Sequence, residues 1–315
     1  MVAIMFPGQG SQTVGMGKGL AQTWPQARDV FAEVDEALGE SLSALMFEGE
    51  AEILTLTENT QPALLATSIA AFRVLQAETG LPGVTALAGH SVGEYAALVA
   101  AESLTLRDAA RLVRLRGREM QRAVPPGEGA MIAVLGLEVT LLTDLAHQAN
   151  TQGHVCAIAN DNCPGQLVIS GHRAAVLRVG ALAKEHGARR VIELAVSAPF
   201  HCALMAPAAH AMAQALSTST IQAPKIPVYA NVTAAPIGAA ADIKDLLSTQ
   251  VTATVRWRET IEALVAAGTI AFIESGEGTV LSGLVKRIKR DAPTFSLAAP
   301  QTMRTAIDWL VNLRA

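Results

Sequence analysis

The sequence predicts an α/β fold in which a large domain with a parallel sheet carries a small inserted subdomain. Three observations support this prediction. Short β-rich runs alternate with longer helical patterns along most of the chain, which is typical of parallel strands joined by helices. The segment PPGEG at 125–129 is the clearest break in that pattern. Since half of the 315 residues are hydrophobic, the chain can bury the core of one large domain together with an insertion.

The part of the chain before this break alternates strands and helices. Thr23 is expected to cap the helix that follows the first glycine-rich loop, with Pro25 in its first turn. Thr105, with Asp108 three residues later, resembles a capping box that opens another helix. The elements expected here are a strand at 2–6, the helix near Pro25, a long apolar helix at 59–78, a short strand at 85–89, and helices at 94–101 and 105–122.

Residues 125–196 are predicted to form a small ferredoxin-like subdomain, because their order of strand, helix, strand, strand, helix and strand is the signature of that module. These six elements are expected at 129–137, 140–149, 155–159, 166–171, 173–186 and 189–194. Residues 1–124 and 197–315 then form the large domain. Its second part again alternates helices and strands, with a strand at 271–275, a helix through 286–290 and a last helix at 302–313.

The composition limits the classes of partner and compartment. A net charge of −4 and an isoelectric point near 6.0 leave no overall basic field, so we expect no nucleic-acid partner. Cys156, Cys163 and Cys202 lack paired metal-ligand spacing, which argues against disulfides and zinc and favours the cytoplasm. The start MVAIMFPGQG is typical of a first strand and not of a signal peptide, and no run of about 20 apolar residues occurs, so we expect no membrane anchor. We also expect a monomer.

Ser91 lies in the pentapeptide Gly89-His90-Ser91-Val92-Gly93, which matches G-x-S-x-G between an expected strand and an expected helix. Flanking glycines relieve crowding in so sharp a turn, and the Ser91 hydroxyl then projects above the sheet as a candidate nucleophile. This elbow makes the large domain α/β-hydrolase-like. The alternative is a tight turn in which Ser91 only caps the helix. We interpret His90 as structural.

A serine nucleophile needs a base, and several histidines compete for that role. His201 differs from the others because it lies in VSAPFHCALM, at the junction of a proline-bearing loop and a helix, where the large α/β pattern resumes. Most of the other histidines fall on expected helix surfaces. The seven candidates are His90, His147, His154, His172, His186, His201 and His210.

Arg116 is out of place on its expected helix. Five other arginines recur every three or four residues and form one stripe, which predicts a solvated face. At about 100° per residue, Arg116 points to roughly the opposite side, among Leu112, Val113 and Met120. A buried guanidinium needs either an internal carboxylate or an acidic ligand. The stripe consists of Arg107, Arg111, Arg114, Arg118 and Arg122.

Seven segments along the chain resemble, in order and spacing, the malonyl-CoA:acyl carrier protein transacylases, the acyltransferases of type II fatty acid synthesis. They are FPGQGSQTVGMG, TQPALL, AGHSVGEYAAL, RLVRLRGREMQ, NCPGQLVISG, SAPFHCALM and QVTATVRW. The resemblance covers essentially the whole chain and is far more specific than the pentapeptide alone. It implies ping-pong transfer from malonyl-CoA to the phosphopantetheine thiol of holo acyl carrier protein, with no metal and no cofactor.

The resemblance also implies a role for each catalytic position. Ser91 carries the acyl group and His201 is its base, while the backbone carbonyl of Gln250 orients the histidine in place of a carboxylate. The backbone N–H groups of Gln9 and Val92 form the oxyanion hole.

Arg116 is expected, from the same resemblance, to form a bidentate pair with the free carboxylate of the malonyl group. Phe200 is expected to exclude a 2-methyl branch. Gln61, Asn160 and Asn162 fall on pocket positions of the family. Two positions depart from the usual pattern: Glu277 stands between Gly276 and Gly278 where a small residue is common, and Thr254 replaces the usual proline.

Carrier proteins are acidic, so a basic docking patch is expected on a chain that is net negative. The candidates are Lys286, Arg287, Lys289 and Arg290, with Arg189 and Arg190 next. A solvated helix end is the alternative. Rival functions with the same residues are a stand-alone acyltransferase of polyketide synthesis and the malonyl-transfer subunit of a malonate decarboxylase. A serine hydrolase uses the same elbow, and a non-catalytic relative fits less well because Ser91, His201 and Arg116 are all present.

Overall fold

A six-stranded sheet forms the centre of the larger unit in the computed structural model, which describes residues 1–150 and 153–313. Its strand order is β10-β9-β1-β2-β7-β8, and every neighbouring pair is parallel except β7 and β8. The strands are β1 (Val2–Phe6), β2 (Val84–Gly89), β7 (Val228–Ala230), β8 (Ala235–Pro236), β9 (Ala271–Glu274) and β10 (Thr294–Ser296). The predicted mostly parallel sheet is confirmed.

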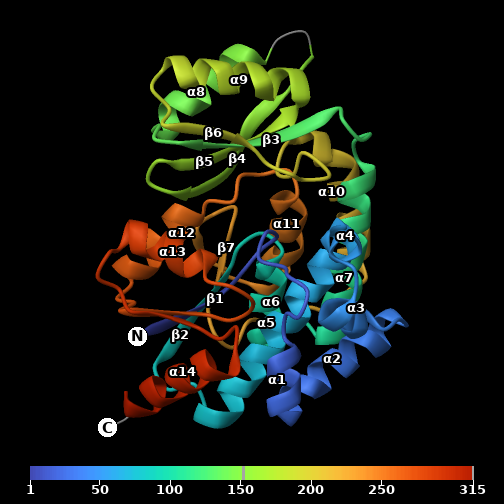
Figure 1. The fold of residues 1–315 in the computed structure, drawn as a ribbon, viewed down its shortest axis with the longest axis vertical. Helices are drawn as coiled ribbons and strands as arrows, with labels where there is room; N and C mark the ends of the chain where they lie inside the picture. Colours follow the sequence, from blue (N-terminus) through green and yellow to red (C-terminus); the bar gives the residue numbers. More distant parts are fainter. Residues whose placement is uncertain (151–152, 314–315) are drawn as a thin grey trace.

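Helices cover both faces of this sheet (Figure 1). All of β1 is buried: Val2, Ile4 and Phe6 pack into the core on one face, and Ala3 and Met5 into the core on the other. This burial explains why β1 is continuously apolar. The helices are α1 (Lys18–Thr23), α2 (Pro25–Leu38), α3 (Leu42–Glu48), α4 (Ala51–Thr55), α5 (Thr57–Thr79), α6 (Gly93–Ala100), α7 (Leu106–Arg122), α10 (Ala206–Ser217), α11 (Ala240–Gln250), α12 (Trp257–Ala266), α13 (Val280–Ile288) and α14 (Pro300–Asn312), with a 3₁₀ turn at Ala203–Met205.

The predicted cap at Thr23 is wrong. Thr23 is the last residue of α1, and its hydroxyl donates to the Gly19 carbonyl. Trp24 takes the cap position of α2, with Pro25 as the first helical residue, and the short helix α1 precedes the single helix expected here. The capping prediction at Thr105 is confirmed, because its Oγ1 accepts a hydrogen bond from the Asp108 backbone N–H.

The smaller unit is an antiparallel sheet of four strands in the order β4-β5-β3-β6, with α8 and α9 on its outer face (Figure 1). This order is the ferredoxin-like one. Its elements are β3 (Gly129–Leu135), α8 (Val139–Ala149), β4 (Cys156–Cys163), β5 (Gln166–His172), α9 (Arg173–Glu185) and β6 (Arg190–Glu193). The division into domains at residues 125 and 196 stays a prediction.

Strand β4 joins the two units. Its Asp161 N–H donates to the Val255 carbonyl at 3.0 Å, and the Val255 N–H donates to the Ala159 carbonyl at 2.9 Å. Arg258 on α12 also pairs with the buried carboxylate of Asp161. These contacts place Asn160 and Asn162 of β4 over the carboxyl end of the large sheet.

The arginine stripe on α7 is largely the solvated face that its spacing predicts: Arg111, Arg118 and Arg122 are exposed and Arg107 is partly exposed. Arg114 is the exception. Arg114 is buried and pairs with Glu40, and the Arg111 Nε donates to the Ala37 carbonyl. The N-terminal part of the stripe, Arg107, Arg111 and Arg114, lies against the α2–α3 region, where acidic side chains and a backbone carbonyl accept from the guanidinium groups. Across the described ranges, no helix is long and apolar enough to cross a membrane.

Candidate active site

Ser91 lies at a sharp turn between β2 and α6, with a φ of 53° in the left-handed region. Both flanking glycines are required by close contacts. A Cβ on Gly89 would lie 2.0 Å from the Gly93 carbonyl carbon, and a Cβ on Gly93 would lie 2.1 Å from the Phe6 oxygen. The turn therefore has the strained geometry of a nucleophile elbow.

His201 contacts the nucleophile directly. The Ser91 Oγ and the His201 Nε2 are 2.7 Å apart, and the His201 Nδ1 donates to the Gln250 carbonyl at 2.9 Å. That carbonyl can only accept, so the Nδ1 carries the proton and the Nε2 is free to take one from Ser91. Burial, together with the positive charge of Arg116, lowers the pKa of His201 to about 3, which keeps the imidazole neutral, with its Nε2 free to accept a proton, and makes it a weaker base than an ordinary histidine.

Arg116 is buried beside the nucleophile, on the inward face of α7. Its Nη1 donates to the Gln61 Oε1 at 2.9 Å, and its Nη2 donates to the Gln250 Oε1 at 2.9 Å and to the Ser91 Oγ at 3.2 Å. Its Nε has no hydrogen-bond partner in the described part of the chain. Among the ion pairs of the described residues, none includes Arg116. Arg116 thus has no direct ion pair with a described carboxylate, although the charge of the buried Glu94 acts on it through space.

A cavity of about 680 Å³ opens in front of these groups, between the carboxyl end of the large sheet and the small sheet. Its walls include the apolar side chains Met120, Met131, Leu194 and Val196. The predicted residues that line it are Gln9, Gln61, Ser91, Val92, Arg116, Asn160, Phe200 and His201.

Asn162 and the basic patch do not line this cavity. The His90 Nε2 donates to the Asn162 Oδ1 at 2.9 Å, so Asn162 holds the histidine that directly precedes Ser91 in the chain. The four basic residues at the end of α13 are exposed, and Arg287 donates to Gln166 in the β4–β5 hairpin.

The oxyanion positions carry unused donors. Within the described part of the chain, the backbone N–H groups of Gln9 and Val92 donate to no protein acceptor. The Ser91 N–H, in contrast, is already bound to the Asn231 Oδ1 at 2.7 Å. Two free N–H groups beside a serine nucleophile are the donors that an oxyanion hole requires.

Asn231 and Glu94 are site residues that the sequence reasoning missed. The Asn231 Nδ2 donates to the Gly89 carbonyl at 2.6 Å, and its backbone N–H donates to the Glu94 Oε2 at 3.0 Å. Asn231 directly follows β7, so a polar residue after a buried strand is the signal that could have identified it. For Glu94, a carboxylate in the otherwise apolar α6 is the corresponding signal.

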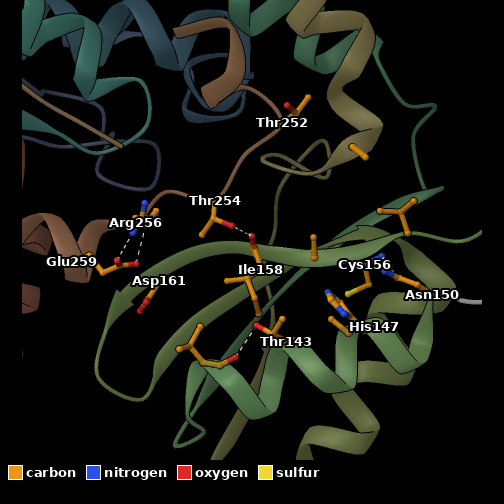
Figure 2. A pocket seen from close by; sticks show the side chains of 15 residues that line it. Thr143, His147, Asn150, Cys156, Ile158, Asp161, Thr252, Thr254, Arg256 and Glu259 are labelled. Carbon is orange, nitrogen blue, oxygen red and sulfur yellow. Dashed lines mark hydrogen bonds and ion pairs between the residues drawn. The ribbon is translucent and has the colours of Figure 1, made fainter. Parts of the chain in front are cut away.

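Thr254 has a structural role in place of the usual proline. Its hydroxyl donates to the Ile158 carbonyl at 2.6 Å and so ties the segment after Gln250 to β4, as Figure 2 shows. It lines a second cavity of about 520 Å³ between α8, β4 and the 252–259 segment. Glu277 is half-buried, and burial raises the pKa of its carboxyl.

The acyl transferase domain family matches residues 4–304 of the chain. The malonyl CoA-acyl carrier protein transacylase of Bacillus subtilis is 48% identical and is aligned over 98% of this chain and 97% of its own length. The corresponding protein of Escherichia coli K12 is 44% identical, over 97% of this chain and 98% of that protein.

Solved structures of malonyltransferases are also similar to this chain in fold and sequence. An acyl-carrier-protein-S-malonyltransferase from Bartonella henselae superposes with a TM-score of 0.95 at 47% identity, covering 98% of this chain and 99% of the other. A malonyl-transacylase solved in complex with a type II PKS acyl-carrier protein superposes with a TM-score of 0.94 at 42% identity, covering 98% and 99%. The chain therefore belongs to the acyl transferase family, among the malonyl CoA-acyl carrier protein transacylases.

Proposed function

We propose that the protein transfers the malonyl group of malonyl-CoA to the phosphopantetheine thiol of holo acyl carrier protein and so supplies fatty acid synthesis. The observation that carries this proposal is the pair formed by Ser91 and Arg116. A nucleophilic hydroxyl and an unpaired guanidinium lie 3.2 Å apart in one cavity, which suits an acyl group that ends in a carboxylate.

In the first half-reaction, the Ser91 Oγ attacks the thioester carbonyl while the His201 Nε2 takes its proton. The backbone N–H groups of Gln9 and Val92 hold the oxyanion. The carbon–sulfur bond then breaks, and the coenzyme A sulfur leaves with the proton from His201, so that malonyl-Ser91 remains.

In the second half-reaction, the carrier thiol gives its proton to the His201 Nε2 and attacks the ester carbonyl of malonyl-Ser91. The same oxyanion donors act again. The bond to the Ser91 Oγ breaks and the proton returns to Ser91, which restores the enzyme. The Gln250 carbonyl keeps the imidazole in the required tautomer throughout, and a thioester is activated enough for this weaker orienting group.

Selectivity for malonyl over acetyl follows from the burial of Arg116. With acetyl, the guanidinium keeps only neutral partners, whereas the malonyl carboxylate compensates its charge in a low-dielectric cavity. Phe200 lines the same cavity and is the residue proposed to exclude a 2-methyl branch.

The proposed reaction uses no metal and no cofactor besides its two substrates, and we place it in the cytoplasm. The three cysteines, Cys156, Cys163 and Cys202, are all buried as free thiols, which suits a reducing compartment. The basic end of α13 remains the proposed docking patch for the carrier.

A carrier protein of polyketide synthesis is the second candidate acceptor. It is favoured by the similarity to a malonyl-transacylase that was solved with such a carrier. The two acceptors share the thiol chemistry and differ in the surface presented to this protein.

Incubation with labelled malonyl-CoA, with and without holo carrier protein, tests the function. We expect label on Ser91 without the carrier, transfer of that label to the carrier thiol, and little free malonate. Ser91→Ala should give no labelled enzyme. Rapid release of malonate to water, with no label on the carrier, would identify a hydrolase instead.

A further inference from the structure

Glu94 is a carboxyl group buried beside the nucleophile without a cationic partner. It lies in the first turn of α6, three residues after Ser91, and is 1% exposed. None of the ion pairs within the described ranges includes it. Burying a carboxyl is unfavourable, so its contacts need a reason.

Both hydrogen bonds of Glu94 lead to residues that build the site. Its Oε2 accepts from the Gln250 Nε2 at 2.7 Å and from the Asn231 backbone N–H at 3.0 Å, while its Oε1 has no partner among the residues that the structure describes. Burial raises the pKa of Glu94 to about 7, and the hydrogen bonds and the charge of Arg116 oppose that rise.

The side-chain amide of Gln250 can work in only one of its two orientations. Its Nε2 donates to Glu94 and, at 3.0 Å, to the Ser91 carbonyl, and its Oε1 accepts from Arg116. The reversed amide would place an N–H₂ group against the guanidinium and an oxygen against the carboxyl group. In its ionised form Glu94 can only accept, and together with the accepting Ser91 carbonyl and the donating Arg116 guanidinium it excludes that orientation.

We propose that Glu94 is a positioning residue, which acts through the Gln250 amide to hold Arg116 where it binds the malonyl carboxylate. Glu94 touches neither substrate nor the reacting atoms. Its effect therefore falls on the choice between malonyl and acetyl groups more than on serine acylation itself. This inference rests on the proposed function, since it assigns a specificity role within the same site.

Two substitutions at position 94 separate positioning from packing. Glu94→Gln can still accept through its Oε1, so the ratio of kcat/KM for malonyl-CoA over acetyl-CoA should stay within about threefold of the parent. Glu94→Leu fills the space without an acceptor, and the same ratio should fall about tenfold. If Glu94→Leu does not fold, Glu94→Gln still tests the proposal, because a fall in the malonyl-to-acetyl ratio of kcat/KM in that variant would contradict it.

A double substitution tests the route through Gln250. Gln250→Met removes the amide and leaves the backbone carbonyl that orients His201. In that background, Glu94→Leu should change the malonyl-to-acetyl ratio by less than about twofold, since coupled residues are not additive. An equal loss in both backgrounds, or an unchanged ratio in Glu94→Leu alone, would overturn the proposal.

Glu274 provides a matched control. It is also a fully buried carboxyl, at the carboxyl end of the inner strand β9, but its side chain accepts hydrogen bonds from the Leu281 and Ser282 N–H groups and not from the residues of the candidate site. Glu274→Leu should lower the thermal midpoint and leave the ratio unchanged. If the parent protein shows no malonyl transfer at all, the proposed function fails; an active parent with an unchanged ratio in Glu94→Leu rejects only the role of Glu94.

Discussion

Ser91 and His201 both adopt the left-handed backbone conformation, with φ values of 53° and 58°. Non-glycine residues in this region are strained by about 1–3 kcal/mol each, and the surrounding structure must hold them there. Here Asn231 binds the Ser91 N–H, and the Gln250 carbonyl binds the His201 ring. These backbone conformations place the Ser91 hydroxyl and the His201 imidazole within hydrogen-bonding distance of each other. Leu81, Glu102 and Ala234 also have positive φ values.

Arg116→Ala tests selectivity at this scale. We expect malonyl transfer to fall about 100-fold, because hydrogen bonds to a charged group contribute about 1.5–3 kcal/mol. Acetyl transfer should be retained or increased, since no buried charge is then left without a partner. Steady-state kinetics with both acyl-CoA substrates measure the two effects.

Arg118→Ala is the control, because Arg118 lies on the opposite face of α7 and pairs with Glu58 at the surface. It should leave both activities near those of the parent. Unchanged malonyl kinetics in Arg116→Ala would refute the role of that residue.

The pH dependence of serine acylation follows from the lowered pKa of His201. With a pKa of about 3, reached through burial and the charge of Arg116, the imidazole stays neutral as the pH falls through the ordinary value of 6.5. The acylation rate with a neutral probe such as p-nitrophenyl acetate should therefore not fall to half its maximum near pH 6.5, where an ordinary histidine becomes protonated. Arg116→Ala should move the pH at which the rate falls on the acidic side of the profile to a higher value. A fall in rate centred near pH 6.5 in the parent would contradict this account.

The same shift affects folding with a defined sign. The unfolded chain binds a proton at His201 below pH 6.5, whereas the folded chain does so only near 3. The contribution of His201 to the free energy of unfolding therefore decreases as the pH falls through that interval, and the folded state becomes less stable.

At the scale of elements, the close approach of α5 and α7 positions Arg116, the proposed specificity residue. A Cβ on Gly117 would lie 2.7 Å from both the Glu58 Cα and the Thr57 carbonyl oxygen. Gly117 thus lets α7 pack against the start of α5, and this contact brings Arg116 next to Gln61.

Gly117→Ala should lower the free energy of unfolding by about 1–2 kcal/mol. Alanine raises helix propensity by about 1 kcal/mol, but overpacking against backbone atoms costs about 1–3 kcal/mol and exceeds it. Urea unfolding measures the difference. Gly283→Ala on α13 is the control with open space around it, and it should be neutral or stabilising. If Gly117→Ala is as stable as the parent, α5 and α7 can move apart at no cost in the free energy of unfolding, and the packing argument is wrong.

At the scale of the whole molecule, residues of the small sheet and of the large unit line the cavity together. β4 contributes Asn160 from above, and its bonds to Val255 connect it to the segment that follows Gln250. On the other side of the large sheet, Glu274 caps α13 and so holds the helix that ends in the basic patch. The fold thus separates acyl selection in the cavity from the proposed carrier docking on α13.

Charge reversal of Lys286 and Lys289 to Glu tests the docking patch. We expect a higher KM for holo carrier protein with unchanged acylation by malonyl-CoA, because rim charges act on encounter and not on chemistry. The KM of the parent should also rise with salt, and that of the variant should rise less. Charge reversal at the exposed Arg28 and Arg304 is the control. An unaltered carrier KM would remove the patch as the docking site.

Much of the site could be predicted because its signals are local. The elbow around Ser91 follows from five neighbouring residues and their strand and helix. The inward position of Arg116 follows from the 100° advance of a helix, which depends on spacing alone. The cap at Thr23 was wrong because Trp24 and Pro25 restart the helix one residue later, and propensity at a helix boundary does not distinguish the two.

The sequence by itself determined the types of the elements, the elbow that carries the proposed nucleophile and the inward guanidinium, since each depends on neighbours within one or two turns. Only the tertiary structure decided what these groups meet. Ser91 lies 110 residues from His201 and 140 from Asn231, and Glu94 lies 156 from Gln250. Contacts at such separations depend on how strands and helices pack, and for Asn231 and Glu94 no periodicity along the chain records them.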